Sequence, residues 1–305
     1  MPLIIPPIRQ ATMRFHYFTY TFIVLGILSF PPLLHLEYSR PPPPHFTRTS
    51  VFEWDEKITI RKNEVTRDAD LCYHVFLDVG ANVGVHCRFL LEPEKYDAAL
   101  SREVFNRYYG KNRDNRDFCC FEFEPNIKHI EALQNVSLAY AKYGWRLYVK
   151  NVGVSDVDEV KNFYHQGDEE HNEWGFTERE NPDLNATLPQ TTQVIRLSTW
   201  ILRHLSPRRI PNITFGNYSH GPRVVMKIDV EGSEYDVIPD LLSSGALCNN
   251  VDFMFGEFHN DIHGKYQPEV FEKSFSIMLA TSRQCNTVFE KLDDESYLLD
   301  GVPLP

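Results

Sequence analysis

The chain has 305 residues, enough for one full hydrophobic core and an additional segment outside it. Its hydrophobic fraction of 42% is ordinary, but its formal net charge is −11. This acidity argues against broad binding to nucleic-acid phosphates, which requires clustered Lys and Arg. The length therefore favours one α/β domain, and the acidity argues against a nucleic-acid partner.

An apolar segment lies near the N-terminus. No Asp, Glu, Lys or Arg occurs from Phe15 to Leu36, and Arg9 and Arg14 precede this stretch. Basic residues on that side are typical of a cytoplasmic start. Two prolines follow Phe30, so the run is short for a bilayer core of roughly 30 Å. We favour a short signal anchor, because no clear small-residue cleavage site follows the run. A cleaved signal peptide and a merely apolar arm are the alternatives.

These features divide the chain into a tail and signal anchor at 1–36, a proline-rich stalk at 37–55 and a globular domain at 56–305. The expected protein is single-pass type II, with its domain in the lumen of the endoplasmic reticulum or Golgi; secretion is the alternative. Six cysteines are compatible with lumenal disulfides or with buried thiols, and the sequence does not give their pairing. Weak further support comes from four N-glycosylation sequons, which begin at Asn135, Asn185, Asn212 and Asn217.

A strand, a glycine turn and a helix are predicted over residues 75–91. A short apolar run rich in β-branched residues ends at Asp78, and Gly80 and Gly84 follow on either side of Asn82. Doubly wound sheets hold nucleotide-like ligands at such turns. Asn82 stands where a dinucleotide-binding turn needs its second glycine, which favours S-adenosylmethionine and disfavours a nicotinamide dehydrogenase. Glycines that serve only packing are the alternative.

Two further strands are predicted to end at acids. The strand at 118–124 stops because Pro125 cannot continue a central ladder, which leaves Glu124 at its end. A carboxylate there takes the ribose hydroxyls in doubly wound folds. The third strand region, 145–154, closes near Asp156, which is placed to meet an adenine amino group or to form a turn. Helices are predicted over 98–109, 128–143, 198–204, 235–243 and 268–281.

A strand predicted at 223–232 carries unexpected charges. Lys227, Asp229 and Glu231 alternate and so share one face, although a central parallel strand is usually apolar on both faces. A site at the carboxyl edge of the sheet explains them, because ligands bind there in open α/β folds. A Lys-Asp pair that stabilises the strand end is the alternative.

The remaining segments give weaker signals. A fifth strand is predicted at 251–259, and 287–290 with 297–299 is expected to form a closing hairpin. His259, Asp261 and His263 have a spacing that is a weak signal for metal, so no metal site is predicted. The long polar loop at 163–193 contains four aromatic candidates for contact with an acceptor, for which simple solvation is the alternative: His165, His171, Trp174 and Phe176.

Four segments together resemble the FkbM-type S-adenosylmethionine-dependent methyltransferases. They are FLDVGANVG at 76–84, FEFEPN at 121–126, NVGVSD at 151–156 and MKIDVEGSEYDVI at 226–238. Glu257-Phe258-His259 is similar to that family's E-x-H ending. The resemblance covers about residues 75–259 and is interrupted by apparent insertions at 92–117 and 163–193.

The resemblance implies a class I, Rossmann-like α/β fold. It implies seven mostly parallel strands with the last pair antiparallel, and helices on both faces. The cofactor would be S-adenosyl-L-methionine, with the ribose on Glu124, and the residues implied around it are Asp78, Gly80, Asn82, Gly84, Glu124 and Asp156. Because the family methylates hydroxyl groups, including those of sugars, the expected acceptor is a glycan or another hydroxyl-bearing molecule.

Methyl transfer to a hydroxyl needs alignment of two centres and removal of a proton. Asp229 is the first candidate for the base or the orienting carboxylate, and Glu231 and His259 are its rivals. The alternative function is a membrane-anchored interaction or trafficking protein that keeps the fold without turnover.

Overall fold

The computed structural model describes residues 66–165, 175–178, 189–260 and 264–298. The chain divides into two units, residues 1–59 and 60–305, and every described residue belongs to the second. No helix within the described part of the chain is long and apolar enough to cross a membrane. The predicted anchor at 1–36 and stalk at 37–55 lie outside it.

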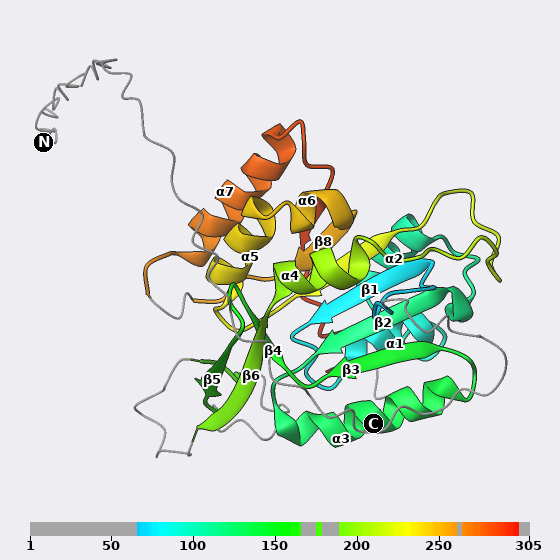
Figure 1. Cartoon of the computed structure of the whole chain (residues 1–305), viewed down its shortest axis with the longest axis horizontal. Coiled ribbons are helices and arrows are strands. Elements are labelled where there is room, and N and C mark those ends of the chain that lie inside the picture. The colour runs from blue at the N-terminus through cyan, green and yellow to red at the C-terminus, as the bar shows by residue number, and fades with distance from the viewer. Residues whose placement is uncertain (1–65, 166–174, 179–188, 261–263, 299–305) are drawn as a thin grey trace, which may run out of the picture. The chain divides into compact units, whose positions relative to one another are not determined.

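A six-stranded sheet forms the centre of the second unit (Figure 1). Every neighbouring pair in it runs parallel, in the order β3-β2-β1-β7-β8-β9. Taken along the chain, this is the order 3-2-1-4-5-6 of Rossmann folds, which reverses between β1 and β7 and binds ligands at that point. The strands are β1 (His74–Val79), β2 (Phe118–Phe123), β3 (Arg146–Lys150), β7 (Val224–Ile228), β8 (Phe253–Gly256) and β9 (Val288–Lys291).

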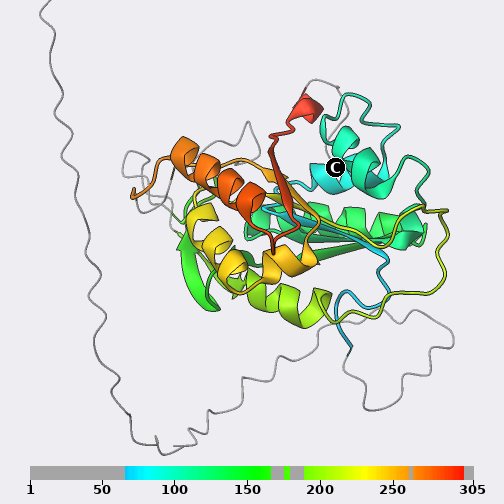
Figure 2. The same cartoon turned by 90° about the horizontal axis from the view of Figure 1, so that it is seen from above.

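Helices cover both faces of this sheet (Figure 2). Phe76 of β1 belongs to the core under α1, α2 and α3, whereas its neighbour Leu77 belongs to the core under α4 to α7. Burial on both faces explains why the central strands read as continuous apolar runs. The helices are α1 (Val85–Leu91), α2 (Ser101–Tyr109), α3 (Ile127–Ala141), α4 (Leu197–Trp200), which continues as a π-helix (Ile201–Leu205), α5 (Glu234–Ser243), α6 (Ala246–Asn250) and α7 (Pro268–Thr281).

A second sheet has three strands in the order β4-β6-β5. It contains β4 (Gly153–Ser155), β5 (Glu159–Phe163) and β6 (Gln190–Arg196), with β5 antiparallel and β4 parallel to β6. The region predicted as one third strand is therefore two strands in different sheets. The chain turns sharply between them, where Val152 N–H donates to Lys150 O at 2.8 Å.

The expected C-terminal hairpin is wrong. β9 pairs with β8 in parallel, and Ser296–Leu298 forms a turn of 3-10 helix. The reason is α7, which lies between β8 and β9 in the chain and provides the crossover that a parallel pair needs. Within the described residues the main sheet accordingly has six parallel strands, not seven with an antiparallel last pair.

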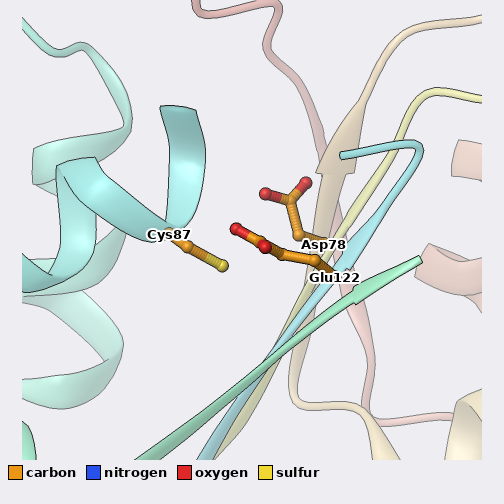
Figure 3. Close-up of side chains that lie close together, drawn as sticks. All are labelled: Asp78, Cys87 and Glu122. Atoms are coloured by element: carbon orange, nitrogen blue, oxygen red, sulfur yellow. The ribbon is translucent and has the colours of Figure 1, made fainter. Parts of the chain in front are cut away.

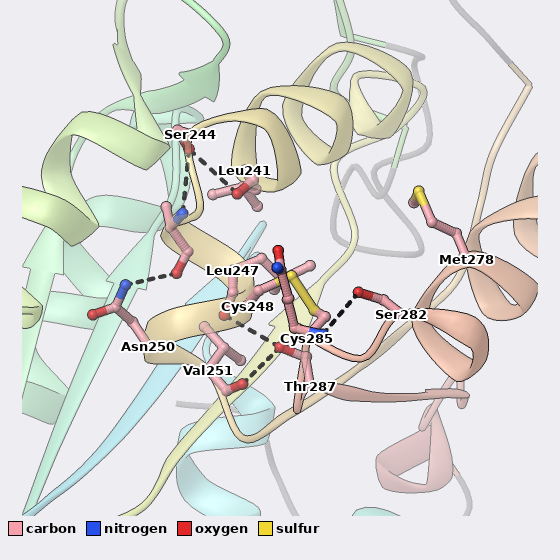
Figure 4. The surroundings of a disulfide bond; sticks show 12 residues. Leu241, Ser244, Leu247, Cys248, Asn250, Val251, Met278, Ser282, Cys285 and Thr287 are labelled. Atoms are coloured by element: carbon pink, nitrogen blue, oxygen red, sulfur yellow. Dashed lines mark hydrogen bonds between the residues drawn. A yellow bond between two sulfur atoms is a disulfide. The ribbon is translucent and has the colours of Figure 1, made fainter.

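Two disulfides join distant segments of this unit. Cys72–Cys119 links the start of the unit to β2, and Cys248–Cys285 links α6 to the segment before β9 (Figure 4). Beside the second bond, the Thr287 hydroxyl donates to Val251 O at 2.8 Å. The remaining two cysteines, Cys87 and Cys120, are free and buried.

Candidate active site

A cavity of about 330 Å³ opens at the carboxyl ends of β1, β2, β7 and β8. This is the edge at which the strand order reverses, where ligands bind in such sheets. The sequence-predicted residues that line it are Gly80, Asn82, Glu124, Asp229, Glu231 and His259. The other three, Asp78, Gly84 and Asp156, are not among the described residues that line it.

The glycine turn is held tightly against two neighbouring strands. A Cβ on Gly80, which has φ +80°, would lie 1.7 Å from the Asp229 carbonyl oxygen. Gly80 N–H donates to Phe123 O at 3.0 Å, so the turn is also tied to β2. A Cβ on Gly84 would lie 2.6 Å from Glu122 Oε1. Gly84 therefore lets α1 close onto the sheet, whereas Gly80 both lines the cavity and permits the close contact with the backbone of Asp229, just after β7.

Glu124 is fixed at the cavity wall by backbone donors. Its Oε2 accepts from Asn82 N–H and its Oε1 from Asn126 N–H, each at 2.7 Å. His129 Nδ1 lies 3.6 Å from Oε1. Asn82 has a left-handed φ of +49°, and its Oδ1 is buried without a hydrogen-bond partner among the described residues. The turn and the β2 carboxylate thus form one rigid corner of the cavity.

Asp78 lies behind the turn, in a buried cluster with Glu122 and Cys87 (Figure 3). Asp78 and Glu122 are register partners on β1 and β2, so their side chains leave the same face of the sheet. Burial raises the pKa of Asp78 to about 7, although Lys227 opposes this effect. Burial, and then the charge of Asp78, raise the pKa of Glu122 far above its usual range. At neutral pH Glu122 thus favours its neutral form, whereas Asp78 is close to the midpoint of its titration; both acids lie in the core beneath the cavity.

Lys227 joins the glycine turn to Asp229. Its Nζ donates to Gly80 O at 2.6 Å and to Asp229 Oδ2 at 2.9 Å, and it lies 4.0 Å from Asp78 Oδ1. Burial raises the pKa of Asp229, but Lys227 and then His259 lower it by more, so Asp229 is a carboxylate at neutral pH. Its side chain is 28% exposed at the cavity. Lys227 thus fixes one oxygen of the Asp229 carboxylate beside the glycine turn.

The segment after β7 differs from the predicted strand. β7 ends at Ile228, and Glu231 has a left-handed φ of +53°. Glu234, fully buried at the start of α5, stabilises this turn: its Oε1 accepts from Val230 N–H at 3.0 Å and its Oε2 from Gly232 N–H at 2.9 Å. Glu231 therefore reaches the cavity from a turn, not from the strand face that alternation predicted.

His259 lies among four carboxylates. Its Nδ1 is 3.0 Å from Glu234 Oε1, and its Nε2 is 2.9 Å from Glu257 Oε1. Asp229 Oδ1 and Glu231 Oε2 are 3.6 Å and 3.7 Å from Nε2. Burial lowers the pKa of His259, but these acids, Glu234 first, raise it overall to about 12. Burial also raises the pKa of Glu231 to about 8. At neutral pH His259 is therefore positively charged and cannot accept a proton.

The other predicted residues lie in varied places. The Ser155 hydroxyl donates to the Asp156 carboxylate at 3.2 Å. Phe176 lines the cavity, and the His165 ring packs against it with centroids 4.7 Å apart. The structure does not describe five of the residues named from the domain sequence: His171, Trp174, Asn185, Asp261 and His263.

Sequence reasoning missed several residues of the cavity. His86 on α1 and the acids Asp293, Asp294 and Glu295 after β9 line it. Glu234 touches the cavity residue His259 from the core. The E-G-S-E spacing after β7 was a signal for Glu234, because an acid at a helix start can accept backbone N–H groups. The acids after β9 gave no local signal, because they reach the cavity only when β9 pairs in parallel with β8.

Comparisons with known proteins identify the family of this chain. The model of the methyltransferase FkbM domain matches residues 78–289. No curated protein matches the chain. Among solved structures, the chain is similar to a methyltransferase FkbM from Methylobacillus flagellatus KT, at 15% identity and a TM-score of 0.29. That similarity covers 57% of this chain and 30% of the bacterial one. Since the domain model matches well over half of its length, the chain belongs to the methyltransferase FkbM domain family.

Proposed function

We propose that this methyltransferase transfers a methyl group from S-adenosylmethionine to a hydroxyl group of its acceptor. The observation that carries the proposal is the corner made by Asn82 N–H and the Glu124 carboxylate, which lines the same cavity as Asp229. Cofactor and acceptor residues thus share a single space at the carboxyl edge of the sheet.

The residues present fit this cofactor. Glu124 retains free lone pairs beside its two backbone donors, and a carboxylate can accept from both hydroxyls of a ribose. The orphaned Oδ1 of Asn82 offers an acceptor in the same corner. Apolar walls from Val154, Phe163 and Phe176 suit a planar ring. When bound, S-adenosylmethionine supplies an electrophilic methyl group on its sulfonium.

Asp229 is proposed to orient the acceptor. Its carboxylate is ionised and partly exposed at the cavity, and Lys227 fixes one of its oxygens. The other oxygen can accept the hydrogen bond of an acceptor hydroxyl and take its proton as the new C–O bond forms. Glu231 is its rival for the proton, whereas a protonated His259 stabilises the carboxylates around it.

A glycan in the secretory pathway is the proposed acceptor. Two disulfides support an oxidising compartment, because such bonds are rare in the cytosol. The sequon residues Asn135, Asn212 and Asn217 are exposed, as glycosylation would require. We propose that the segment at 1–36 anchors the chain in the membrane, with secretion as the alternative.

The test is a calorimetric titration of S-adenosylmethionine into the purified full-length chain. Glu124→Ala should abolish binding, while Glu131→Ala, an exposed acid on α3, should leave it unchanged. Asp229→Asn should keep its affinity for the cofactor, but its rate of methyl transfer to a panel of glycans should fall by about 10²-fold or more. Absence of cofactor binding by the folded chain would favour the alternative, a non-catalytic anchored protein.

A further inference from the structure

A second, open cavity of about 770 Å³ lies at the opposite edge of the main sheet from the active-site cavity. Its wall is built from the end of α1, from α2 and from the segments that lead into β2 and β3. The six residues of β2, a length of about 20 Å, separate it from Glu124 at the other end of the strand. Most of its lining belongs to residues 92–117, the apparent insertion in the family pattern. The proposed methyl transfer makes no use of this cavity.

Positive side chains outnumber negative ones in this second cavity. The four cations are Arg102, Lys111, Arg113 and Arg116, and the two acids are Glu94 and Asp114. Asp114 neutralises Arg116, whose Nε and Nη2 donate to its carboxylate at 2.9 Å and 2.7 Å. The other three cations form no ion pair with any acid in the described part of the chain. The cavity is therefore positively charged, although the net charge of the chain is −11.

Arg102 and Arg113 are held in place by oxygen atoms that carry no net charge. Arg102 Nη2 donates to Tyr96 O at 2.8 Å. Arg113 Nη1 donates to Asn106 Oδ1 at 2.8 Å and to Gly110 O at 3.0 Å. The second amino group of each guanidinium, Nη1 of Arg102 and Nη2 of Arg113, donates to none of the described residues. Both side chains are thus fixed at the cavity wall and keep N–H groups for a further acceptor.

These two guanidinium groups lack a negative partner. The Nε of each is also buried without a hydrogen-bond partner among the residues that the structure describes. Burial lowers the pKa of Arg113 from 12.5 to about 10, and the positive charge of Arg102 acts in the same direction. Buried charges are normally paired, because an unpaired charge keeps the full cost of leaving water. An anion in the cavity would offset this cost, and the fork of N–H donors of an arginine suits the oxygens of a carboxylate or a sulfate.

Two aromatic rings lie in the same cavity. Tyr143 and Trp145, just before β3, line it with ring centroids 5.3 Å apart. Tyr143 is 66% exposed, so its ring is open to a ligand. A flat apolar ring packs well against the C–H face of a sugar, whereas a bare inorganic anion gains nothing from it. Cations beside exposed rings therefore favour a sugar that carries a negative charge.

We propose that this second cavity binds an acidic sugar, sulfated or carboxylated, of the glycan acceptor. The anionic group binds to Arg102, Lys111 and Arg113, and the sugar ring packs against Tyr143. That the sugar belongs to the methyl acceptor rests on the proposed function, whereas the sugar site itself does not. An acceptor held at both cavities binds more tightly without any change at the reacting hydroxyl.

The experiment is a calorimetric titration of the full-length chain with three hexasaccharides. Chondroitin sulfate carries sulfates and carboxylates, hyaluronan carries carboxylates alone, and maltohexaose is uncharged. Chondroitin sulfate should bind and maltohexaose should not. Equal affinity for hyaluronan would assign the carboxylate as the bound group, and loss of binding would assign the sulfate. No binding of either acidic hexasaccharide, or equal binding of maltohexaose, would overturn the proposal.

Variants locate this binding in the second cavity. Lys111→Gln and Arg113→Gln should each weaken it by about tenfold or more, and Tyr143→Ala by about threefold or more. Lys111 and Tyr143 are exposed, so their variants should fold. Arg107→Gln is the matched control, because it removes a positive charge from α2 but Arg107 pairs with Glu290 and does not line the cavity. Equal losses for Arg107→Gln and Lys111→Gln would show unspecific attraction by charge and overturn the site.

Glu124→Ala separates this proposal from the proposed function. It should lose S-adenosylmethionine and keep the acidic hexasaccharide. A wild-type chain that binds the hexasaccharide but no cofactor would retain the sugar site and lose the methyl transfer. With a hexasaccharide that accepts a methyl group, Lys111→Gln should raise KM by about tenfold and leave kcat unchanged. An unchanged KM would show that the second cavity does not bind the acceptor.

Discussion

At the scale of single residues, the glycines offer a graded test of the turn. Gly80→Ala places a Cβ on a residue with a left-handed φ, and this Cβ would lie only 1.7 Å from the Asp229 carbonyl oxygen. The substitution should therefore destabilise the fold by at least about 3 kcal/mol and abolish cofactor binding. Gly264→Ala keeps a φ of +64° but meets no atom within 4 Å, and should cost about 1 kcal/mol. Gly221→Ala has open space and no such φ, and should be neutral. Denaturant unfolding of the three variants measures this order; equal losses at Gly80 and Gly264 would show that the contact with Asp229 is unimportant.

At the scale of elements, the Cys248–Cys285 bond holds α6 to the segment that leads into the edge strand β9. It closes a separation of 37 residues, for which loop entropy predicts about 2–4 kcal/mol of stabilisation. The double variant Cys248→Ser, Cys285→Ser should lose this amount, and hydrogen exchange should rise in α6 and β9 while β1 and β2 stay protected. The Cys72–Cys119 bond remains intact in this variant and serves as the internal control. Exchange that rises equally in all strands would contradict a local role for the bond.

At the scale of the whole molecule, buried ionisable groups change stability with pH in opposite directions. Burial, and then the charges of His220, Arg208 and Arg223, lower the pKa of His74 from 6.5 to about 3. As the pH falls, His74 is therefore protonated in the unfolded chain before it is protonated in the folded one. The contribution of His74 to the free energy of unfolding is lost as the pH falls from 6.5 toward 3. Burial raises the pKa of Asp78 from 3.8 to about 7, so its contribution is present below pH 3.8 and is lost as the pH rises through 7.

Two matched variants separate these effects. The stability of the wild type relative to His74→Asn should fall on acidification between pH 6.5 and pH 4, and relative to Asp78→Asn it should rise, each by about 1.4 kcal/mol per pH unit. Urea unfolding at several pH values measures both slopes. Slopes of the same sign for the two variants would contradict these pKa shifts.

The sequence by itself determined the α/β fold, most of its helices and the family. Local patterns were sufficient, because strands that are buried on both faces are apolar throughout and the glycine turn requires residues without a Cβ. The carboxyl ends of such strands meet at one edge, so the nearness of Gly80, Glu124 and Asp229 also followed from sequence.

Only the tertiary structure decided how the C-terminal part completes the sheet and the cavity. The direction of β9 depends on the crossover through α7, so the sequence of β9 alone does not predict it. The place of Glu231 depends on a left-handed turn that Glu234 holds through backbone contacts. The carboxylates around His259 come from the ends of separate strands, and their spacing is fixed by sheet packing and not by distance along the chain.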